Sequence, residues 1–259
     1  MLPESFDLDF SDDDLNRYSR HILLPEVGAV GQAKLRESSV LIVGAGGLGS
    51  PVALYLAAAG VGRIGLVDDD RVELSNLQRQ ILFDSDDIGQ AKVASAEKRL
   101  SALNPQIEIV TYSLRADATT LPELIGSYDL VCDGCDNFAT RYAVADCSWA
   151  QDKTLISGAV QRFEGTLSTF SPRSGGPCYR CLYPDADETT ALSCGQAGIF
   201  GAVTGVIGTL MATEALKELL SLGKGLTGRV LVWSALDASF RSFDLPPDPA
   251  CSCCGRGAL

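Results

Sequence analysis

The stretch VLIVGAGGLGSPVALYLAAAG, residues Val40–Gly60, predicts the centre of the fold. Its first four residues indicate a short buried strand, because an apolar run of this length is too brief for a helix. Gly44, Gly46 and Gly49 follow in the pattern G-x-G-x-x-G, and good helix formers continue to Ala59. A strand, a glycine turn and a helix N-terminus form an anion site, since free N–H groups and the helix dipole face a phosphate. The stretch therefore predicts nucleotide binding, with a tight turn that binds no ligand as the alternative.

The composition limits the classes of protein that this chain can belong to. With 259 residues, 46% hydrophobic and 21% charged, the chain is long enough to bury a large core. A formal net charge of -12 argues against a nucleic-acid binder, which would carry a basic stripe. The acidic, polar start does not resemble a signal peptide, and no run of about 18 apolar residues suggests a membrane span. We therefore expect a cytoplasmic protein with reduced cysteines that binds neither membranes nor nucleic acid.

Polar side chains follow two of the predicted strands, where open parallel sheets bind their ligands. Asp68 comes directly after the strand expected over 63–67, where a Rossmann-like site holds a ribose hydroxyl. Asp136 and Asn137 follow another strand, expected over 128–132. These two residues can bind a ligand or cap the helix that comes next, and both roles can hold with different residues.

The chain between these strands holds further polar and basic residues. Val72–Phe83, VELSNLQRQILF, is polar in its centre and apolar at its ends. A NAD dehydrogenase would normally continue here with an ordinary crossover helix, so this segment favours a second set of ligand contacts. Lys92 lies near the start of a helix expected over 89–103, where a cation is unfavourable unless an anion lies beside it.

The N-terminal region carries one more pair of basic side chains. Helical spacing over 15–26 places Arg17 and Arg20 three residues apart, on one helix face. That face is either solvated or part of an arm that reaches a phosphate, and the residues alone favour neither. His21, the single histidine, has no acidic or cysteine partner nearby in sequence and is interpreted as a surface or packing residue.

Two C-x-x-C pairs predict a metal site. Cys178 and Cys181 form the first pair, and Cys251 and Cys254 form the second. Four thiolates complete a closed tetrahedral zinc site, which would be structural and would pin the C-terminus to the main domain. A redox pair or unpaired thiols are the alternatives, and Cys253 could replace a neighbour as ligand.

The other cysteines divide into two kinds. Cys194 stands alone in an expected loop before the long helix, where it is either a nucleophile with a lowered pKa or a passive thiol. Cys132, Cys135 and Cys147 lie in strand or helix context and are interpreted as buried small residues.

These elements predict an α/β fold with a Rossmann-like open sheet, mostly parallel and then antiparallel, helices on both faces and a zinc-bearing C-terminal lobe. Further strands are expected over 107–112, 154–156, 229–233 and 239–243, a hairpin from 161, and helices over 139–150 and 199–220. We expect one domain over 1–259, made of an N-terminal helical arm (1–35), a nucleotide-binding half (36–160) and a second half with the zinc site (161–259).

Six motifs resemble those of the ThiF/MoeB/HesA family, the bacterial relatives of ubiquitin-activating enzymes. They are RYSRHILL (17–24), GAGGLG (44–49), DDDRVELSNLQRQILF (68–83), GQAK (89–92), CDN (135–137) and the paired C-x-x-C. The resemblance implies an ATP-dependent adenylyltransferase that activates the C-terminal glycine of a small ubiquitin-like sulfur carrier with a Gly-Gly tail. The carrier would be of the MoaD kind, for molybdopterin, or of the ThiS kind, for thiamin. It further implies Mg²⁺, a homodimer, a carrier-binding second half and a sulfur donor such as a cysteine desulfurase.

The resemblance also implies the residues of the site. The nucleotide-binding positions that match are Gly44, Gly46, Gly47, Asp68, Asp70, Ser75, Asn76, Arg79, Gln80, Lys92, Asp136 and Asn137. Asp68 would hold the ribose, Asp136 would bind Mg²⁺, and Arg20 would reach the ATP of the other subunit. Catalysis is thereby assigned to Arg20, Arg79, Lys92 and Asp136. Cys194 matches the sulfur-linking cysteine of ThiF-type members, and MoeB-type members carry a cysteine there without needing it.

The implied chemistry suits these residue types. A carrier carboxylate, with a pKa near 3.5, is already ionised at neutral pH and can attack phosphorus without a general base. Catalysis then depends on alignment and on neutralising the charge between two anions, so no histidine is required.

Other classes of function account for fewer of the motifs. A NAD-dependent oxidoreductase leaves SNLQRQ and the paired cysteines unexplained, and a non-catalytic scaffold has no use for a charged phosphate pocket. A related enzyme that acts on modified tRNA fits the acidic charge and the C-x-x-C pairs less well. We expect the 162–170 hairpin and the segment 184–198 to form the walls of a groove for the carrier tail. We also expect no appended rhodanese domain.

Overall fold

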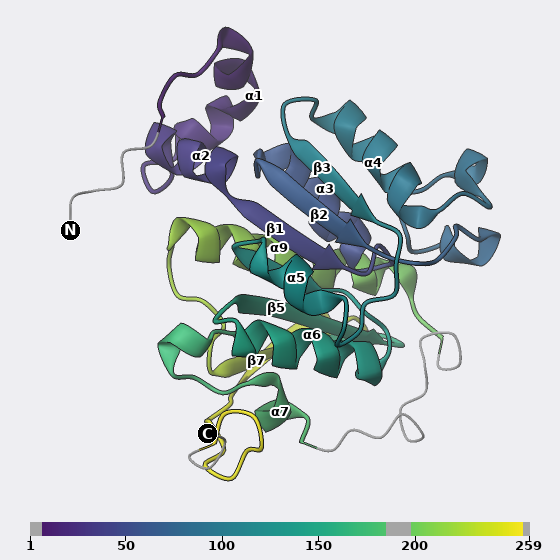
Figure 1. The fold of residues 1–259 in the computed structure, drawn as a ribbon, viewed down its shortest axis with the longest axis vertical. Helices are drawn as coiled ribbons and strands as arrows, with labels where there is room; N and C mark the ends of the chain where they lie inside the picture. The colour runs from purple at the N-terminus through teal and green to yellow at the C-terminus, as the bar shows by residue number, and fades with distance from the viewer. Residues whose placement is uncertain (1–6, 185–197, 256–259) are drawn as a thin grey trace.

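One eight-stranded sheet runs through the molecule, in the order β3-β2-β1-β4-β5-β6-β7-β8 (Figure 1). The structure is a computed structural model that describes residues 7–184 and 198–255. The strands are β1 (Ser39–Val43), β2 (Arg63–Val67), β3 (Glu108–Tyr112), β4 (Leu130–Asp133), β5 (Thr154–Gln161), β6 (Glu164–Phe170), β7 (Arg229–Ser234) and β8 (Ser239–Asp244). Strands β3 to β5 pair in parallel, and β5 to β8 pair antiparallel. The predicted change from parallel to antiparallel pairing is therefore confirmed.

Helices cover both faces of this sheet. They are α1 (Asp12–Ile22), α2 (Gly28–Glu37), α3 (Gly49–Ala59), α4 (Lys92–Leu103), α5 (Leu121–Gly126), α6 (Phe138–Ala150), α7 (Tyr179–Leu182) and α9 (Gly201–Leu220). Ile42 of β1 packs with α3, α4 and α9 in one core, which contains Leu56 and Ile207. The next residue back, Leu41, packs with α5 and α6 in a second core, which contains Val144. Successive side chains of a strand point to opposite faces, so the apolar run of β1 serves both cores.

Several elements begin or end at other residues than the sequence spacing predicts, each for a local reason. Helix α1 begins at Asp12, earlier than predicted, because Ser11 caps it and accepts from the backbone N–H of Asp14 at 3.1 Å. Helix α4 begins at Lys92, later than predicted, because Gly89 has a left-handed φ of +86°. Strand β5 continues to Gln161, past the predicted end, because it pairs with β6 as well as with β4.

Helices α2, α5 and α7 were not predicted. Helix α2 contains Gly28 and Gly31, which are weak helix formers, and it forms by packing beside α1 and α9. Helix α5 is six residues long and carries a proline in its first turn. Within 7–184 and 198–255, no helix has both the length and the apolar character that crossing a membrane requires.

Candidate functional site

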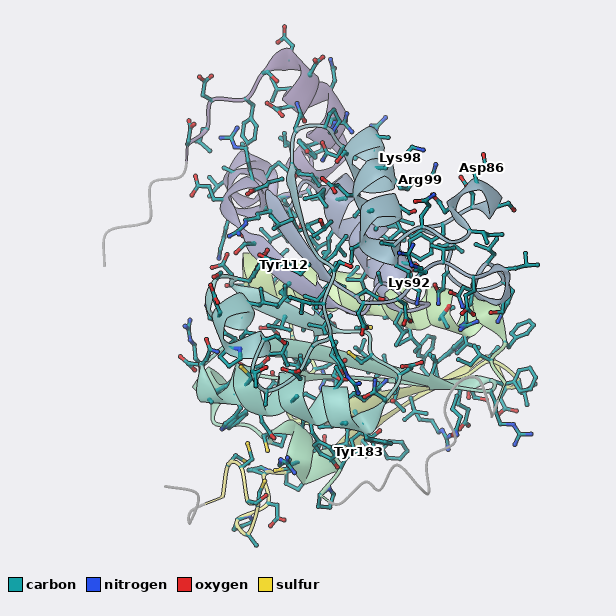
Figure 2. The ribbon with its side chains drawn as sticks, turned by 45° about the vertical axis from the view of Figure 1, so that its right-hand side comes forward. Asp86, Lys92, Lys98, Arg99, Tyr112 and Tyr183 are labelled. Atoms are coloured by element: carbon teal, nitrogen blue, oxygen red, sulfur yellow. The ribbon has the colours of Figure 1, made fainter. Side chains whose placement is uncertain are left out.

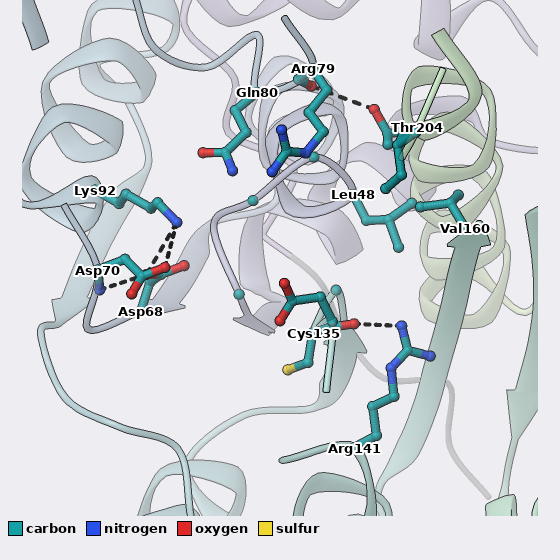
Figure 3. A pocket seen from close by; sticks show the side chains of 16 residues that line it. Leu48, Asp68, Asp70, Arg79, Gln80, Lys92, Cys135, Arg141, Val160 and Thr204 are labelled. Carbon is teal, nitrogen blue, oxygen red and sulfur yellow. Dashed lines mark hydrogen bonds and ion pairs between the residues drawn. The ribbon is translucent and has the colours of Figure 1, made fainter. Parts of the chain in front are cut away.

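A pocket lies at the carboxyl ends of the central parallel strands, where β1, β2 and β4 meet the N-terminus of α3 (Figure 3). Its lining residues are Gly44, Gly46, Gly47, Leu48, Asp68, Asp70, Arg79, Gln80, Lys92, Gly134, Cys135, Asp136, Arg141, Val160, Ile199 and Thr204. This is the ligand-binding edge of an open α/β sheet. Nine of the twelve predicted nucleotide positions line it, all except Ser75, Asn76 and Asn137.

The glycine turn is packed too closely for side chains at two positions. A Cβ on Gly49 would lie 1.9 Å from the carbonyl oxygen of Gly44. Gly44 has a φ of +92°, and a Cβ there would lie 3.1 Å from the backbone of Gly134. The pattern therefore reflects close contact between the β1 and β4 turns and the start of α3, which leaves backbone groups of the turn facing the pocket.

Acidic groups that follow β2 and a basic group at the start of α4 meet on one side of the pocket. Lys92 Nζ donates to Asp70 at 2.8 Å and lies 4.0 Å from Asp68, so the expected anion beside this lysine comes from the protein itself. Asp68 also accepts from the N–H of Ala45 at 2.8 Å and thereby ties β2 to the glycine turn. Burial raises the pKa of Asp68, against the opposing effect of Lys92. This corner holds a nearly buried cation that a phosphate could share.

The opposite side of the pocket is formed by the segment after β2 and by the start of α9. Arg79 donates to the carbonyl of Ser75 at 3.1 Å, and its own carbonyl accepts from Thr204 of α9 at 3.4 Å. Gln80 is 3% exposed, and its Oε1 has no hydrogen-bond partner among the described residues. Figure 3 shows Arg79 and Gln80 across the pocket from Asp68. An unpartnered buried acceptor at this wall suits a ligand that donates a hydrogen bond.

Three predicted positions, Ser75, Asn76 and Asn137, do not line the pocket. Asn76 closes a 3-10 turn by accepting from the N–H of Glu73 at 3.2 Å, and Ser75 is exposed. Asn137 is the N-cap of α6, accepting from Thr140 N at 2.8 Å, and it lines a hollow that adjoins the pocket. Asp136 lines both the pocket and this hollow. The cap of α6 is therefore Asn137, whereas ligand binding by Asp136 stays a prediction.

The predicted N-terminal residues lie on α1, outside the lining of this pocket. Arg17 donates to the carbonyl of Leu103 at 2.9 Å, so it ties α1 to the end of α4. Arg20 is exposed. His21 is half-buried with Nδ1 at 3.1 Å from Gln32 Oε1, in agreement with a packing role.

Sequence reasoning missed two polar lining residues, Thr204 and Arg141. Arg141 is 7% exposed, and its guanidinium donates to the carbonyl of Cys135 (Figure 3). Its spacing carried a usable signal, since it lies four residues after the N-cap Asn137 and so shares that side of α6. Cys135 itself is buried, and burial raises the pKa of its thiol, in agreement with a packing role.

The four predicted cysteine ligands converge, although the two pairs are 73 residues apart. Their sulfurs all lie within 4.8 Å of one another, and three of the separations are 3.3, 3.5 and 3.9 Å. Zinc with Zn–S bonds of about 2.3 Å separates its tetrahedral ligands by about 3.8 Å, so this donor set fits zinc. Backbone N–H groups of Asp248 and Cys253 point at Cys181 and Cys251, each at 3.4 Å. Cys253 donates its backbone N–H to the cluster and its thiol interacts with Cys178, but it is not one of the four that converge.

Further predicted thiols and the predicted groove walls lie outside the cysteine cluster. Cys132 is buried as expected, whereas Cys147 is only half-buried. Cys194 and most of the predicted wall at 184–198 lie outside the described residues. The other predicted wall is the β5–β6 turn, where Arg162 exchanges backbone bonds with Gly198 and Phe200 at 3.2 and 3.0 Å.

Known proteins are similar in sequence to most of this chain. The chain matches the ThiF family over residues 18–253. A sulfur carrier protein adenylyltransferase of Thermus thermophilus is 47% identical over 94% of this chain and 92% of its own length. The SAMP-activating enzyme E1 of Haloferax volcanii is 44% identical over 95% of this chain and 90% of its own length. The adenylyltransferase and sulfurtransferase MOCS3 of Aedes aegypti is 46% identical, and the chain spans 56% of that protein.

Solved structures share the fold. Escherichia coli MccB with MccA-N7isoASN has a TM-score of 0.82 at 25% identity, over 96% of this chain and 76% of that chain. PaaA has a TM-score of 0.77 at 23% identity, over 96% of this chain and 78% of that chain. With a family match across most of its length and a curated relative at 47% identity, the chain belongs to the ThiF family.

Proposed function

We propose that the protein is an ATP-dependent adenylyltransferase that activates the C-terminal glycine carboxylate of a ubiquitin-like sulfur carrier. A carboxylate oxygen of the carrier bonds to the α-phosphorus of ATP. The bond between this phosphorus and the oxygen that bridges it to the β-phosphorus breaks. The bonding electron pair leaves with pyrophosphate, so the products are a carrier acyl-adenylate and pyrophosphate. The names of the relatives at 47% and 44% identity support this activity.

The observation that carries the proposal is the set of charges around the glycine turn. Lys92 and Arg79 face the turn from opposite sides, and the buried guanidinium of Arg141 lies below it. Two anions, the carrier carboxylate and the triphosphate, repel each other, so the reaction requires cations placed between and around them. Asp68 has the position of a ribose ligand at the end of β2.

The residues would act by binding and alignment. An ionised carboxylate needs no general base, and the backbone N–H groups at the start of α3 offer an anion site for phosphate. On nucleotide binding, Lys92 would exchange its contact with Asp70 for a phosphate oxygen. Asp70 is well exposed, with a side-chain exposure of 68%, so releasing it leaves a solvated carboxylate.

Two metal ions belong to the proposal. Asp136 would hold Mg²⁺, which supplies additional neutralisation of phosphate charge when bound. Cys178, Cys181, Cys251 and Cys254 would hold Zn²⁺ in a closed site, with a structural role because no coordination position stays open.

A homodimer is the proposed assembly, because Arg20 is exposed on α1, does not line the pocket of its own chain and would serve the partner's nucleotide. Mixing Arg20→Ala and Asp136→Ala subunits tests this. If Arg20 acts across the dimer, the mixed dimer has one intact site and regains activity that neither variant has alone. If Arg20 acts in its own chain, mixing restores nothing.

The proposed carrier is of the MoaD or the ThiS kind, for molybdopterin or thiamin synthesis in the cytoplasm, with a cysteine desulfurase or another sulfur donor downstream. Cys194 remains a candidate for a covalent sulfur intermediate. ATP–pyrophosphate exchange with Mg²⁺, measured with each carrier in turn, tests the function and names the pathway. Exchange with one carrier supports adenylation for that pathway.

The same assay separates the alternatives. ATP binding without exchange on either carrier would overturn carrier adenylation and favour an enzyme that acts on modified tRNA. Binding of NAD in preference to ATP would favour an oxidoreductase. A carrier that lacks its last glycine is the matched control, because it retains the carrier surface but loses the reacting carboxylate.

A further inference from the structure

Arg141 links the nucleotide pocket to the segment that carries the first cysteine pair. It lines the nucleotide pocket and also a second, smaller hollow between β5, β6 and α7. Tyr179, which lies between Cys178 and Cys181 in sequence, lines that second hollow from the other side. Arg141 therefore lies between the nucleotide pocket and the segment of the first cysteine pair.

On the nucleotide side, Arg141 holds the turn that presents Asp136. Its Nη2 donates to the carbonyl of Cys135, the residue directly before Asp136. The same turn is held at its start by Asp133, a fully buried carboxylate that accepts from Cys135 N at 3.0 Å and from Ser157 Oγ at 2.9 Å. The buried positive charge of Arg141 is compensated by Asp133, which raises the pKa of the guanidinium against the effect of burial.

On the side of the first cysteine pair, Tyr179 lies beside Arg141 and restricts its position. The ring is 3% exposed and contacts Phe170, Tyr142 and Tyr183, with centroid separations of 5.6, 5.7 and 5.2 Å. Its hydroxyl is buried beside Arg141 and interacts with that guanidinium. A ring packed in this way cannot move without disturbing the guanidinium beside it.

We propose that Arg141 is a positioning residue that keeps Asp136 at the nucleotide pocket, and that Tyr179 of the first cysteine pair supports it. Arg141 acts through the backbone of the Cys135–Asn137 turn. The cysteine cluster is thereby coupled to the nucleotide pocket rather than being only a clamp for the C-terminus. This inference rests on the proposed function, because Asp136 is assigned there as the Mg²⁺ ligand.

A double-mutant cycle tests the inference. ATP–pyrophosphate exchange and calorimetric ATP binding, both at varied Mg²⁺, are measured for wild type, Arg141→Gln, Asp136→Ala and the double variant. We expect Arg141→Gln to lower exchange by about a hundredfold, because a small displacement of a reacting constellation has an effect of this size. If Arg141 acts through Asp136, the double variant lies within about threefold of Asp136→Ala alone.

The Mg²⁺ dependence separates positioning from general support of the fold. Arg141→Gln should raise the half-saturating Mg²⁺ concentration about tenfold, with a smaller rise in Arg141→Lys, which keeps a donor for the Cys135 carbonyl. Tyr179→Phe removes one oxygen and should shift the Mg²⁺ requirement in the same direction. Arg180→Gln is the matched control, since Arg180 joins α7 to Asp146 on α6 at 2.7 Å and does not line the pocket.

Three outcomes overturn the inference: multiplicative losses in the double variant, an unchanged Mg²⁺ requirement, or an equal effect of Arg180→Gln. If Arg141→Gln does not fold, Arg141→Lys and Tyr179→Phe decide the question through their Mg²⁺ requirement. A wild-type protein that neither exchanges pyrophosphate nor binds Mg²⁺ with ATP contradicts the proposed function instead. The two failures are therefore distinguishable.

Discussion

The nucleotide pocket and the cysteine cluster are two ligand sites built in opposite ways. In the pocket, charges are already paired within the chain, as in the contact of Lys92 with Asp70 at 2.8 Å, and the walls are ends of core strands. In the cluster, four thiols face one another, and no helix or strand is present between Leu245 and Gly255. Figure 1 places this segment at the far end of the molecule from α1.

The difference is one of cause. The sheet and its helices form the nucleotide pocket, whereas the cysteine cluster orders the chain around it. The sheet holds the pocket in shape whether or not a nucleotide is bound. The cluster joins α7, which packs into the second core through Tyr179, to a C-terminal segment without helix or strand, so the order of that segment depends on the proposed zinc. Changes in the pocket should therefore reduce activity more than stability, and changes in the cluster should do the reverse.

The largest expected effect is on catalysis in the pocket. Arg79→Met keeps the apolar stem and removes the charge, and we expect pyrophosphate exchange to fall about a hundredfold to a thousandfold. The melting temperature should change little, because Arg79 donates only to a local carbonyl among its described contacts. Arg99→Met on the exposed side of α4 is the control (Figure 2). A large fall in the melting temperature of Arg79→Met would contradict the expectation that changes in the pocket reduce activity more than stability.

The glycine turn is the exception within the pocket, since it belongs to the core. Gly49→Ala places a Cβ 1.9 Å from a backbone oxygen, and we expect a loss of about 3 kcal/mol, or about 6–12 °C in melting temperature. Gly46→Ala is the paired variant, because its nearest neighbour would be Gln80 Nε2 at 3.7 Å. It should melt like wild type. Equal melting of the two variants would contradict the role given to close packing.

Removing the metal tests how much the cysteine cluster contributes to stability. Loss of an ion present at a hundred times its Kd lowers the free energy of unfolding by about 2.7 kcal/mol, or about 5–11 °C here. Cys254→Ser or a chelator should produce this shift, as followed by calorimetry with zinc analysis. Cys147→Ser, outside the cluster, should melt like wild type. A Cys254→Ser protein that melts unchanged would mean that the cluster does not depend on metal.

The smallest expected effect concerns Asn137. Loss of a helix cap lowers stability, whereas loss of a nucleotide contact lowers pyrophosphate exchange. As the N-cap of α6 it should contribute about 1 kcal/mol to stability, which Asn137→Ala removes. Exchange should fall by less than about threefold, since Asn137 does not line the pocket. Asn137→Asp keeps the cap and is the control. A much larger loss of exchange at unchanged stability would show that this residue binds the nucleotide.

Local spacing predicted much of the fold and part of the site. The glycine turn, Asp68 at the end of β2 and the C-x-x-C pairs each lie within one short segment, so their geometry follows from sequence. Thr204 comes from α9 and Arg141 from α6, and their place at the pocket depends on tertiary packing. Helix α2 also escaped prediction for this reason, since packing overrides its glycines.

The central claim is that this pocket joins AMP to a carrier carboxylate. Intact mass spectrometry of a carrier incubated with the protein, ATP and Mg²⁺, with pyrophosphatase added, tests it most directly. The account predicts an AMP adduct on the C-terminal glycine that hydroxylamine removes, and no adduct with Asp136→Ala or with a carrier that lacks its last glycine. An adduct that persists on the truncated carrier, or none on a full set of MoaD-kind and ThiS-kind carriers, would contradict it.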